Sequence, residues 1–569
     1  MSTRTPRNRL WRPAVAAAAV ITVTAGVSGA TPGAGKASGV PELGLVAASK
    51  SVTLDSWTED PGVYLDLGTY LTASGAPLEL RVTRKSYKDP VVATQVIHDG
   101  DKTRTRVLPA GTVKDFSGLP GFVRITVRDA AGKIVVNRSE SFCPNNASGR
   151  ILPEAPATSK YPESCPTNPF TLGSVWGVEE GWASNTYAGY YGAPVVLPAG
   201  QYTAEVSVAP RYRMLFGVTG KPQTVKVTVR ERSWEEENPS ASTARGSRAA
   251  SGHAGHTGHA GHAGTRTPAP VSATTGAGPS YNVGHGPHPP APAAVPWADK
   301  RLGFRSAQGD APGRTDGSRQ APAVAPEARR PTGRASVPDV PKPDLRSLPA
   351  YGITIGQTTG GEPGKDYLAF SANVWNAGPA QLVVDGFRKP GNALMDAYQY
   401  FYDASGKQVG YTPTGTMEWD PRPGHEHWHF TDFASYRLLK ADKKETVRSG
   451  KEAFCLANTD AVDYTVENAN WHPGNTDLST ACGQENSISV REVLDVGSGD
   501  TYTQDLPGQS FDITGLPNGT YYIQVLANPE NRLKETDLGN NSALRKVVLG
   551  GKPGARTVTV PKHDLVTAP

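Results

Sequence analysis

The sequence has few cysteines, little excess charge and no long apolar run beyond its N-terminus. Only 4 of its 569 residues are Cys, and none forms a Cys-x-x-Cys arrangement, so a zinc knuckle or a redox pair is not expected. The formal net charge of +5 is small for this length and does not indicate a nucleic-acid partner. Helical periodicity is almost absent, which argues against a helical bundle.

The N-terminus has the features of a secretory signal peptide over residues 1–30. Four arginines precede an apolar run over residues 14–27, and the small residues Ser28, Gly29 and Ala30 follow it. A retained membrane anchor is the alternative, but the run is short for a bilayer and has no stop-transfer flank. We therefore expect a secreted protein, cleaved near Ala30, with no stable membrane insertion after cleavage.

The four cysteines agree with an oxidising compartment. They form two pairs of close neighbours that almost three hundred residues separate. Of the three possible connectivities, the local bridges Cys143–Cys165 and Cys455–Cys482 are the simplest.

The pattern of the chain predicts a mainly β protein. Residues 45–232 alternate apolar and polar side chains between Gly, Pro, Asp and Asn clusters, which indicates an antiparallel, sandwich-like region of unknown role. Residues 233–342 have the composition of a disordered Pro/Ala/Gly/His-rich linker. A second β domain is expected over residues 343–549, followed by a polar tail over residues 550–569.

The predicted linker carries a histidine repeat of period three, with two further histidines after it. A flexible histidine tract can bind copper, zinc or nickel loosely, because each imidazole is a ligand without a fixed cavity. The alternative is a low-complexity repeat with no selected role. The histidines concerned are His253, His256, His259, His262, His285 and His288.

The most informative stretch is Pro-Gly-His425-Glu-His427-Trp-His429-Phe. Alternate side chains of an extended strand leave the same face, so these three imidazoles converge. Three imidazoles suit copper or zinc. The alternative is a strand with three unrelated histidines, but the chain has only 12 His in total. The sequence therefore predicts a metal site on a strand.

A series of blocks in the second β domain follows the histidine stretch in a characteristic order. The blocks are Tyr436-Arg-Leu-Leu439, Ser449-Gly-Lys451-Glu-Ala-Phe-Cys455, Gly499-Asp-Thr-Tyr502, Phe511-Asp-Ile-Thr514, Pro517-Asn-Gly-Thr-Tyr-Tyr522, Val525-Leu-Ala-Asn-Pro529 and Glu535-Thr-Asp537 before Asn540-Asn541. Together with the histidines, this series resembles the catalytic domain of the lysyl oxidase family, over about residues 343–549.

The resemblance implies a copper-dependent amine oxidase with a self-derived cofactor. His425, His427 and His429 match the three copper ligands of the family. Lys451 and Tyr502 match the residues that are joined as lysine tyrosylquinone. The implied reaction converts peptidyl lysine or other primary amines to aldehydes, uses oxygen, and releases ammonia and hydrogen peroxide.

Several other polar residues lie near these blocks without an assigned role. Asp432, Asp500 and Asp505 are candidates for the general base, although acidic residues in such loops are usually turn formers. His472 could approach the metal but is more readily explained as a surface residue. His98 is isolated in the N-terminal region, where a surface or structural role is expected.

The chain also departs from the animal members of the family. Gly424 stands where they carry a cysteine, Trp419-Asp420 replaces a Trp-His pair, and only one cysteine pair is available in the domain. A more open site and a different substrate range are therefore expected. One alternative function is a non-catalytic extracellular protein that binds or sequesters copper. Another is a cupin-like mononuclear metal enzyme that shares only the histidine pattern.

Overall fold

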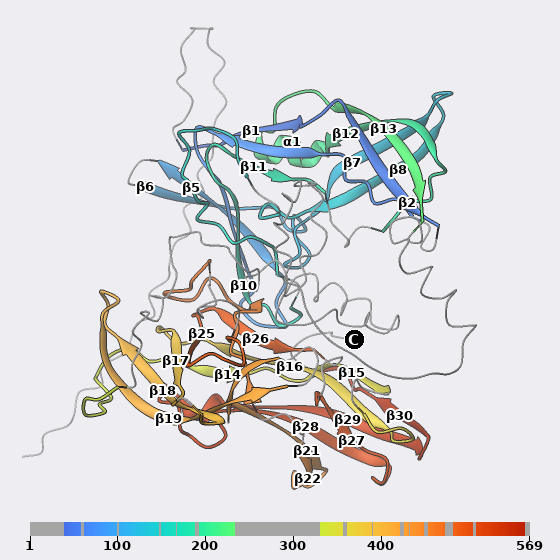
Figure 1. Cartoon of the computed structure of the whole chain (residues 1–569). Helices are drawn as coiled ribbons and strands as arrows, with labels where there is room; N and C mark the ends of the chain where they lie inside the picture. Colours follow the sequence, from blue (N-terminus) through green and yellow to red (C-terminus); the bar gives the residue numbers. More distant parts are fainter. Residues whose placement is uncertain are drawn as a thin grey trace, which may run out of the picture. The chain divides into compact units, whose positions relative to one another are not determined.

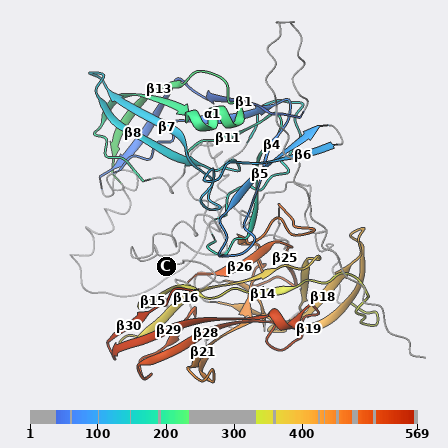
Figure 2. The same cartoon turned by 180° about the vertical axis from the view of Figure 1, so that it is seen from behind.

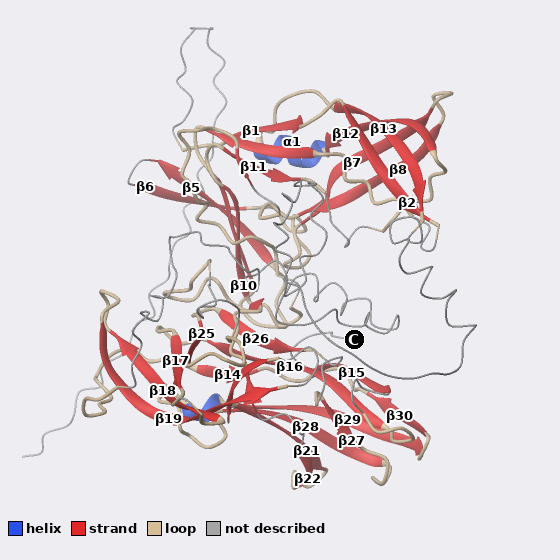
Figure 3. Ribbon diagram, in the orientation of Figure 1, coloured by secondary structure: helices blue, strands red, loops and turns tan. Residues whose placement is uncertain are grey.

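Strands form nearly all of the regular structure, which confirms the predicted mainly β class (Figure 3). The computed structural model describes residues 39–233 and 331–563, with gaps at 59–61, 100–101, 147–148, 167, 188–192, 357–360, 390, 422–425, 432, 449–452, 473–481 and 504–507. The predicted signal peptide and the histidine repeat lie outside the described residues. Among the residues that are described, no helix is long and apolar enough to cross a membrane.

Residues 39–233 contain three sheets, drawn in blue to green (Figure 1). The first has the order β1 (Glu42–Ala47), β3 (Thr69–Ser74), β11 (Trp182–Asn185) and β9 (Gly149–Arg150). The second has the order β10 (Gly173–Val178), β4 (Leu78–Thr83), β5 (Val92–Asp99) and β6 (Lys102–Val107). The third has the order β2 (Ser51–Trp57), β13 (Gln223–Arg232), β12 (Gly200–Val208), β7 (Leu119–Asp129) and β8 (Ile134–Phe142).

Alternation of apolar and polar residues produces this N-terminal arrangement. In β13, Val225, Val227 and Val229 are buried while the intervening side chains face outward, as expected for a strand with one face on a core. Among the described strands of this region, the pairing is antiparallel except between β2 and β13, which run parallel, and an isolated parallel bridge joins Gly44 to Thr219. The short helix α1 (Pro210–Phe216) begins with a proline, whose missing N–H is tolerated there, and ends at Gly217 in the left-handed conformation.

Residues 331–563 contain three further sheets. One has the order β14 (Leu345–Ser347), β16 (Tyr367–Asn376), β26 (Ser498–Tyr502) and β24 (Asp460–Ala461), with β15 (Tyr351–Gly356) and β27 (Ser510–Asp512) also paired to β16. The next has the order β23 (Ala453–Phe454), β20 (His427–Thr431), β19 (Gln408–Asp420), β18 (Leu394–Tyr402), β17 (Leu382–Phe387) and β25 (Ser489–Leu494).

The last sheet has the order β22 (Glu445–Arg448), β21 (Ala434–Lys440), β28 (Gly519–Ala527), β29 (Ser542–Lys552) and β30 (Ala555–Thr559). Figures 1 and 2 show β28 and β29 as neighbours from both sides. A single 3-10 turn, η3 (Leu538–Asn540), precedes β29 among the described residues. Paired strands thus continue past residue 550, and at the other end Ser336 forms a bridge with Tyr411.

β16 is the organising strand of this second group. Nine of its ten residues are buried, and it is hydrogen-bonded to β14, β15, β26 and β27. Its apolar side chains Leu368, Phe370, Ala372 and Val374 belong to the core that also contains Trp428. Ser371 and Asn373 on the opposite face are buried as well, so β16 is covered on both faces although its sequence is not purely apolar.

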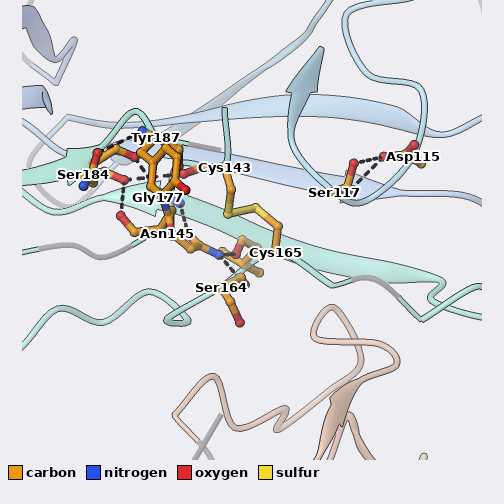
Figure 4. The surroundings of a disulfide bond; sticks show 12 residues. Asp115, Ser117, Cys143, Asn145, Ser164, Cys165, Gly177, Ser184 and Tyr187 are labelled. Carbon is orange, nitrogen blue, oxygen red and sulfur yellow. Dashed lines mark hydrogen bonds between the residues drawn. A yellow bond between two sulfur atoms is a disulfide. The ribbon is translucent and has the colours of Figure 1, made fainter. Parts of the chain in front are cut away.

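Both predicted disulfides are confirmed. Cys143 bonds to Cys165, and Cys455 bonds to Cys482. Beside the first bond, the amide of Asn145 donates to the carbonyls of Ser164 and Val175 and accepts from the Gly177 N–H (Figure 4). This disulfide and Asn145 therefore tie the loop before β10 to β10 itself.

Candidate functional site

Two of the three predicted histidine ligands lie together on β20. The side chains of His427 and His429 are each 1% exposed, and their ring centroids are 4.6 Å apart. Trp428 between them points to the opposite face, into the core, where it meets Trp419. The alternation expected from the sequence thus brings two imidazoles to one place. His425 lies outside the described residues.

A buried carboxylate adjoins this histidine pair. Asp420 ends β19 directly opposite His427, and its Oδ2 lies 3.4 Å from Nδ1 of His429. A carboxylate at Nδ1 fixes the orientation and tautomer of an imidazole and directs Nε2 toward a metal. From the sequence alone, Asp420 is only part of a departure from the family pattern, because its place beside the histidines depends on the pairing of β19 with β20.

Tyr502 ends β26 and is 3% exposed. Its hydroxyl donates a hydrogen bond of 2.9 Å to the backbone carbonyl of Cys455. Its ring packs edge-on against Phe454, with centroids 5.0 Å apart. Phe454 is paired with Phe430 of β20, so Tyr502 contacts a residue adjacent to the strand that carries the histidines and shares the core cluster of Trp428 and Phe430.

The Cys455–Cys482 disulfide joins these two parts of the site. The backbone N–H of Trp428, between the two histidines, donates a hydrogen bond of 3.0 Å to the carbonyl of Cys482. The backbone carbonyl of Cys455 accepts the hydrogen bond from Tyr502. The tyrosine and the histidine strand are therefore hydrogen-bonded to the two cysteines of one disulfide.

The remaining sequence candidates have different positions. Lys451, Asp432 and Asp505 lie outside the described residues. Asp500 is 2% exposed and leaves the same face of β26 as Tyr502, because the two are separated by one residue. His472 is partly buried in a loop whose Trp471 contacts Tyr161 of the N-terminal region.

The isolated His98 has a structural partner. Its Nε2 lies 3.0 Å from Oε2 of the buried Glu79. Within the ranges that the structure describes, no group of three or more His, Cys, Asp or Glu side chains is arranged to hold a metal. The pair on β20 supplies two imidazoles of the predicted three.

Comparison with known proteins agrees with this geometry. The family model described as lysyl oxidase matches residues 403–557, which include β20, Cys455, Cys482 and Tyr502. These residues form a lysyl oxidase family domain. The resemblance that the sequence blocks indicate is therefore confirmed.

Curated relatives of this lysyl oxidase domain occur in animals. Lysyl oxidase homolog 4 of Mus musculus is 30% identical over 128 residues, which are 22% of this chain and 15% of the relative. Protein-lysine 6-oxidase of Sus scrofa is 32% identical over 125 residues, which are 22% of this chain and 44% of the relative. The chain therefore spans less than half of the length of these relatives, and the family match begins at residue 403.

Proposed function

We propose that this protein is a secreted, copper-dependent amine oxidase. It converts peptidyl lysine or other primary amines to aldehydes and releases ammonia and hydrogen peroxide, with oxygen as the electron acceptor. The observation that carries the proposal is the link between the tyrosine and the histidine strand through one disulfide. The hydroxyl of Tyr502 and the N–H of Trp428 are bonded to its two cysteines.

In this proposal, His425, His427 and His429 hold the copper ion. The donor set fits, because imidazole suits copper and two rings of the three are buried within 4.6 Å of each other. Asp420 restrains His429 at Nδ1. A buried carboxylate beside the ligands also partly balances the charge of a divalent cation.

Lys451 and Tyr502 would provide the organic cofactor. Lys451 precedes Cys455 by four residues, so the chain places their Cα atoms within about 14 Å of each other. Cys455 is the residue whose carbonyl accepts the hydrogen bond from Tyr502. Copper and the quinone, when present, supply the oxidising chemistry that converts an amine to an aldehyde.

In this reaction, the residues of the chain orient the phenol, exclude water from it and supply the amine that bonds to it. The carbonyl of Cys455 fixes the Tyr502 hydroxyl, and Phe454 limits the rotation of its ring. Burial of the ring excludes bulk water from the phenol. The amine of Lys451 has to be neutral to form a bond to an oxidised Tyr502, because an ammonium group has no lone pair.

A peptide map of the copper-loaded full chain tests the proposal. We expect a covalently joined pair of peptides, one with Lys451 and one with Tyr502, together with peroxide release from a primary amine. Tyr502→Phe should abolish both and retain bound copper. Tyr436→Phe is the matched control, because Tyr436 is also buried and packs edge-on against Phe454, with centroids 5.6 Å apart. Copper binding by an unmodified chain that releases no peroxide would instead support the copper-sequestering alternative.

A further inference from the structure

One segment of the N-terminal region is hydrogen-bonded to a loop of the C-terminal part of the chain. We call residues 168–173 the docking segment and residues 460–471 the receiving loop. The Leu172 N–H donates to the carbonyl of Val462 at 2.8 Å, and the Tyr464 N–H donates to the carbonyl of Gly173 at 3.0 Å. These bonds form part of a parallel bridge between Gly173 and Asp463. The described residues on both sides belong to one compact unit.

Side chains extend this contact on both sides of the bridge. The Thr171 hydroxyl donates to the carbonyl of Ala461 at 3.0 Å, and both residues are 0% exposed. Phe170 shares a buried cluster with Tyr351, Trp375 and Val462. This contact contains two buried apolar clusters and buried hydrogen bonds. Interfaces between independently moving domains are more polar, so the two parts are expected to pack as one unit.

The second apolar cluster lies over the end of the receiving loop. Tyr161 stacks with Trp471 at a centroid distance of 6.5 Å, and the guanidinium of Arg81 lies 4.4 Å from the Trp471 ring centroid. Tyr161 also donates to the buried Glu79 at 3.0 Å. The residues of this cluster come from both parts of the chain.

Gly173 shows how closely the two surfaces fit. A Cβ atom at this position would overlap the carboxylate of Asp463 and the hydroxyl of Thr465, and the three nearest atoms all come from the receiving loop. Its backbone is not in the left-handed region, so the glycine is required by the close approach and not by its own conformation.

The docking segment reaches Tyr502 through two side chains. Asn168 donates from Nδ2 to Oδ2 of Asp460 at 3.3 Å, and the hydroxyl of Thr501 donates to the same oxygen. Thr501 directly precedes Tyr502. The Thr501 N–H is itself bonded to the Thr459 hydroxyl at 2.7 Å, and Asp460 is paired with Gly499 across β24 and β26.

We propose that the N-terminal region positions Tyr502 for quinone formation, with Asn168 as a positioning residue that acts through Asp460 and Thr501. The effect on quinone formation rests on the function proposed above, but the restraint of β26 by the docking segment does not. The docking segment is held on its own side by the Cys143–Cys165 bond and by Asn145, so it presents a fixed surface to the receiving loop. Without it, β24 and β26 become more mobile, and the phenol spends less time where Lys451 can reach it.

The test compares Gly173→Ala with Gly149→Ala in the copper-free and copper-loaded full chain. Gly149 is the matched control, because it lies in the same region and has nothing within 4 Å of its added Cβ. We expect Gly173→Ala to increase hydrogen exchange of the peptides covering 460–464 and 498–502 by about tenfold or more. The joined Lys451–Tyr502 peptide should form at least about tenfold more slowly after copper addition, with unchanged copper stoichiometry.

Asn168→Ala provides a second variant that introduces no overlap. Like Gly173→Ala, it should accelerate hydrogen exchange at 498–502 and slow formation of the joined peptide. Asn168→Asp should behave as Asn168→Ala does, because a second carboxylate would face Asp460. Unchanged exchange and unchanged quinone formation in both variants would overturn the proposal. If the wild-type chain forms no joined peptide, the proposed function fails, and the exchange comparison alone decides whether the docking segment restrains β26.

Discussion

The hydroxyl of Tyr502 donates its hydrogen bond to Cys455, whose disulfide partner Cys482 accepts the N–H of Trp428. Two segments far apart in the sequence are thus fixed to the two ends of one covalent bond. The disulfide has a local structural role at the candidate site as well as a general stabilising one.

Replacing both Cys455 and Cys482 with Ser should therefore affect stability and copper binding together. The sequence separation is 27 residues, for which loss of the bridge lowers the free energy of unfolding by about 3–4 kcal/mol. Urea unfolding and copper titration measure the two effects. The Cys143→Ser/Cys165→Ser protein should lose stability but keep its copper affinity, and equal copper loss in both proteins would contradict the prediction.

Asp420→Asn should weaken copper binding without unfolding the chain. The carboxylate lies 3.4 Å from Nδ1 of His429, and loss of such a partner typically lowers metal affinity about 10–100-fold. Competition with a chelator of known affinity measures the change. Asp442→Asn, at an exposed turn of the same domain, is the control and should bind copper as the wild type does. An unaltered affinity in Asp420→Asn would remove this residue from the site.

The buried pair Asp385–Arg491 should respond differently to single and double replacement. Nε and Nη2 of Arg491 lie 2.6 and 2.7 Å from the two carboxylate oxygens, directly across β17 and β25. Arg491→Ala leaves a buried carboxylate without its counter-charge and should cost about 3–5 kcal/mol of unfolding free energy. Asp385→Leu/Arg491→Met should recover most of that loss in chemical unfolding, and a double variant as unstable as the single one would refute the argument.

Glu79 should make stability depend on acid pH. Burial raises its pKa, but the hydrogen bond to His98 and the charges of Lys160 and Arg81 outweigh this effect, so the pKa lies below its ordinary value. Its contribution is then fully present above the ordinary pKa of glutamate and is lost as pH falls through the lowered value in the folded state.

Urea unfolding of wild type and Glu79→Gln at pH 7 and pH 3 measures this contribution. At pH 7, the free energy of unfolding of Glu79→Gln should be about 2 kcal/mol lower than that of the wild type. This gap between the two proteins should shrink as the pH falls. Glu205→Gln, on an exposed position of β12, should match the wild type at both values. A difference that is constant with pH would contradict the assignment to the Glu79 charge.

The local features of the chain were predictable because they depend on neighbouring residues. Alternation in strands such as β13, the closeness of each cysteine pair, and the convergence of His427 with His429 all follow from short-range geometry. The parallel pairing of β2 with β13 and the placement of Asp420 beside His429 depend on register between distant segments. No local pattern encodes that register. The contact between Phe170 and Tyr351 could not be predicted from the sequence for the same reason.

The position of β16 has a practical consequence for recombinant expression. A fragment trimmed to the family match would start at residue 403 and would lack β14 to β18, including the strand that pairs with β26. The newly created open edge of β26 would favour aggregation in the host cell. A fragment that keeps β26 paired must therefore begin upstream of the bridge between Ser336 and Tyr411. Because the docking segment covers the receiving loop with buried apolar side chains, residues 39–233 should be retained as well.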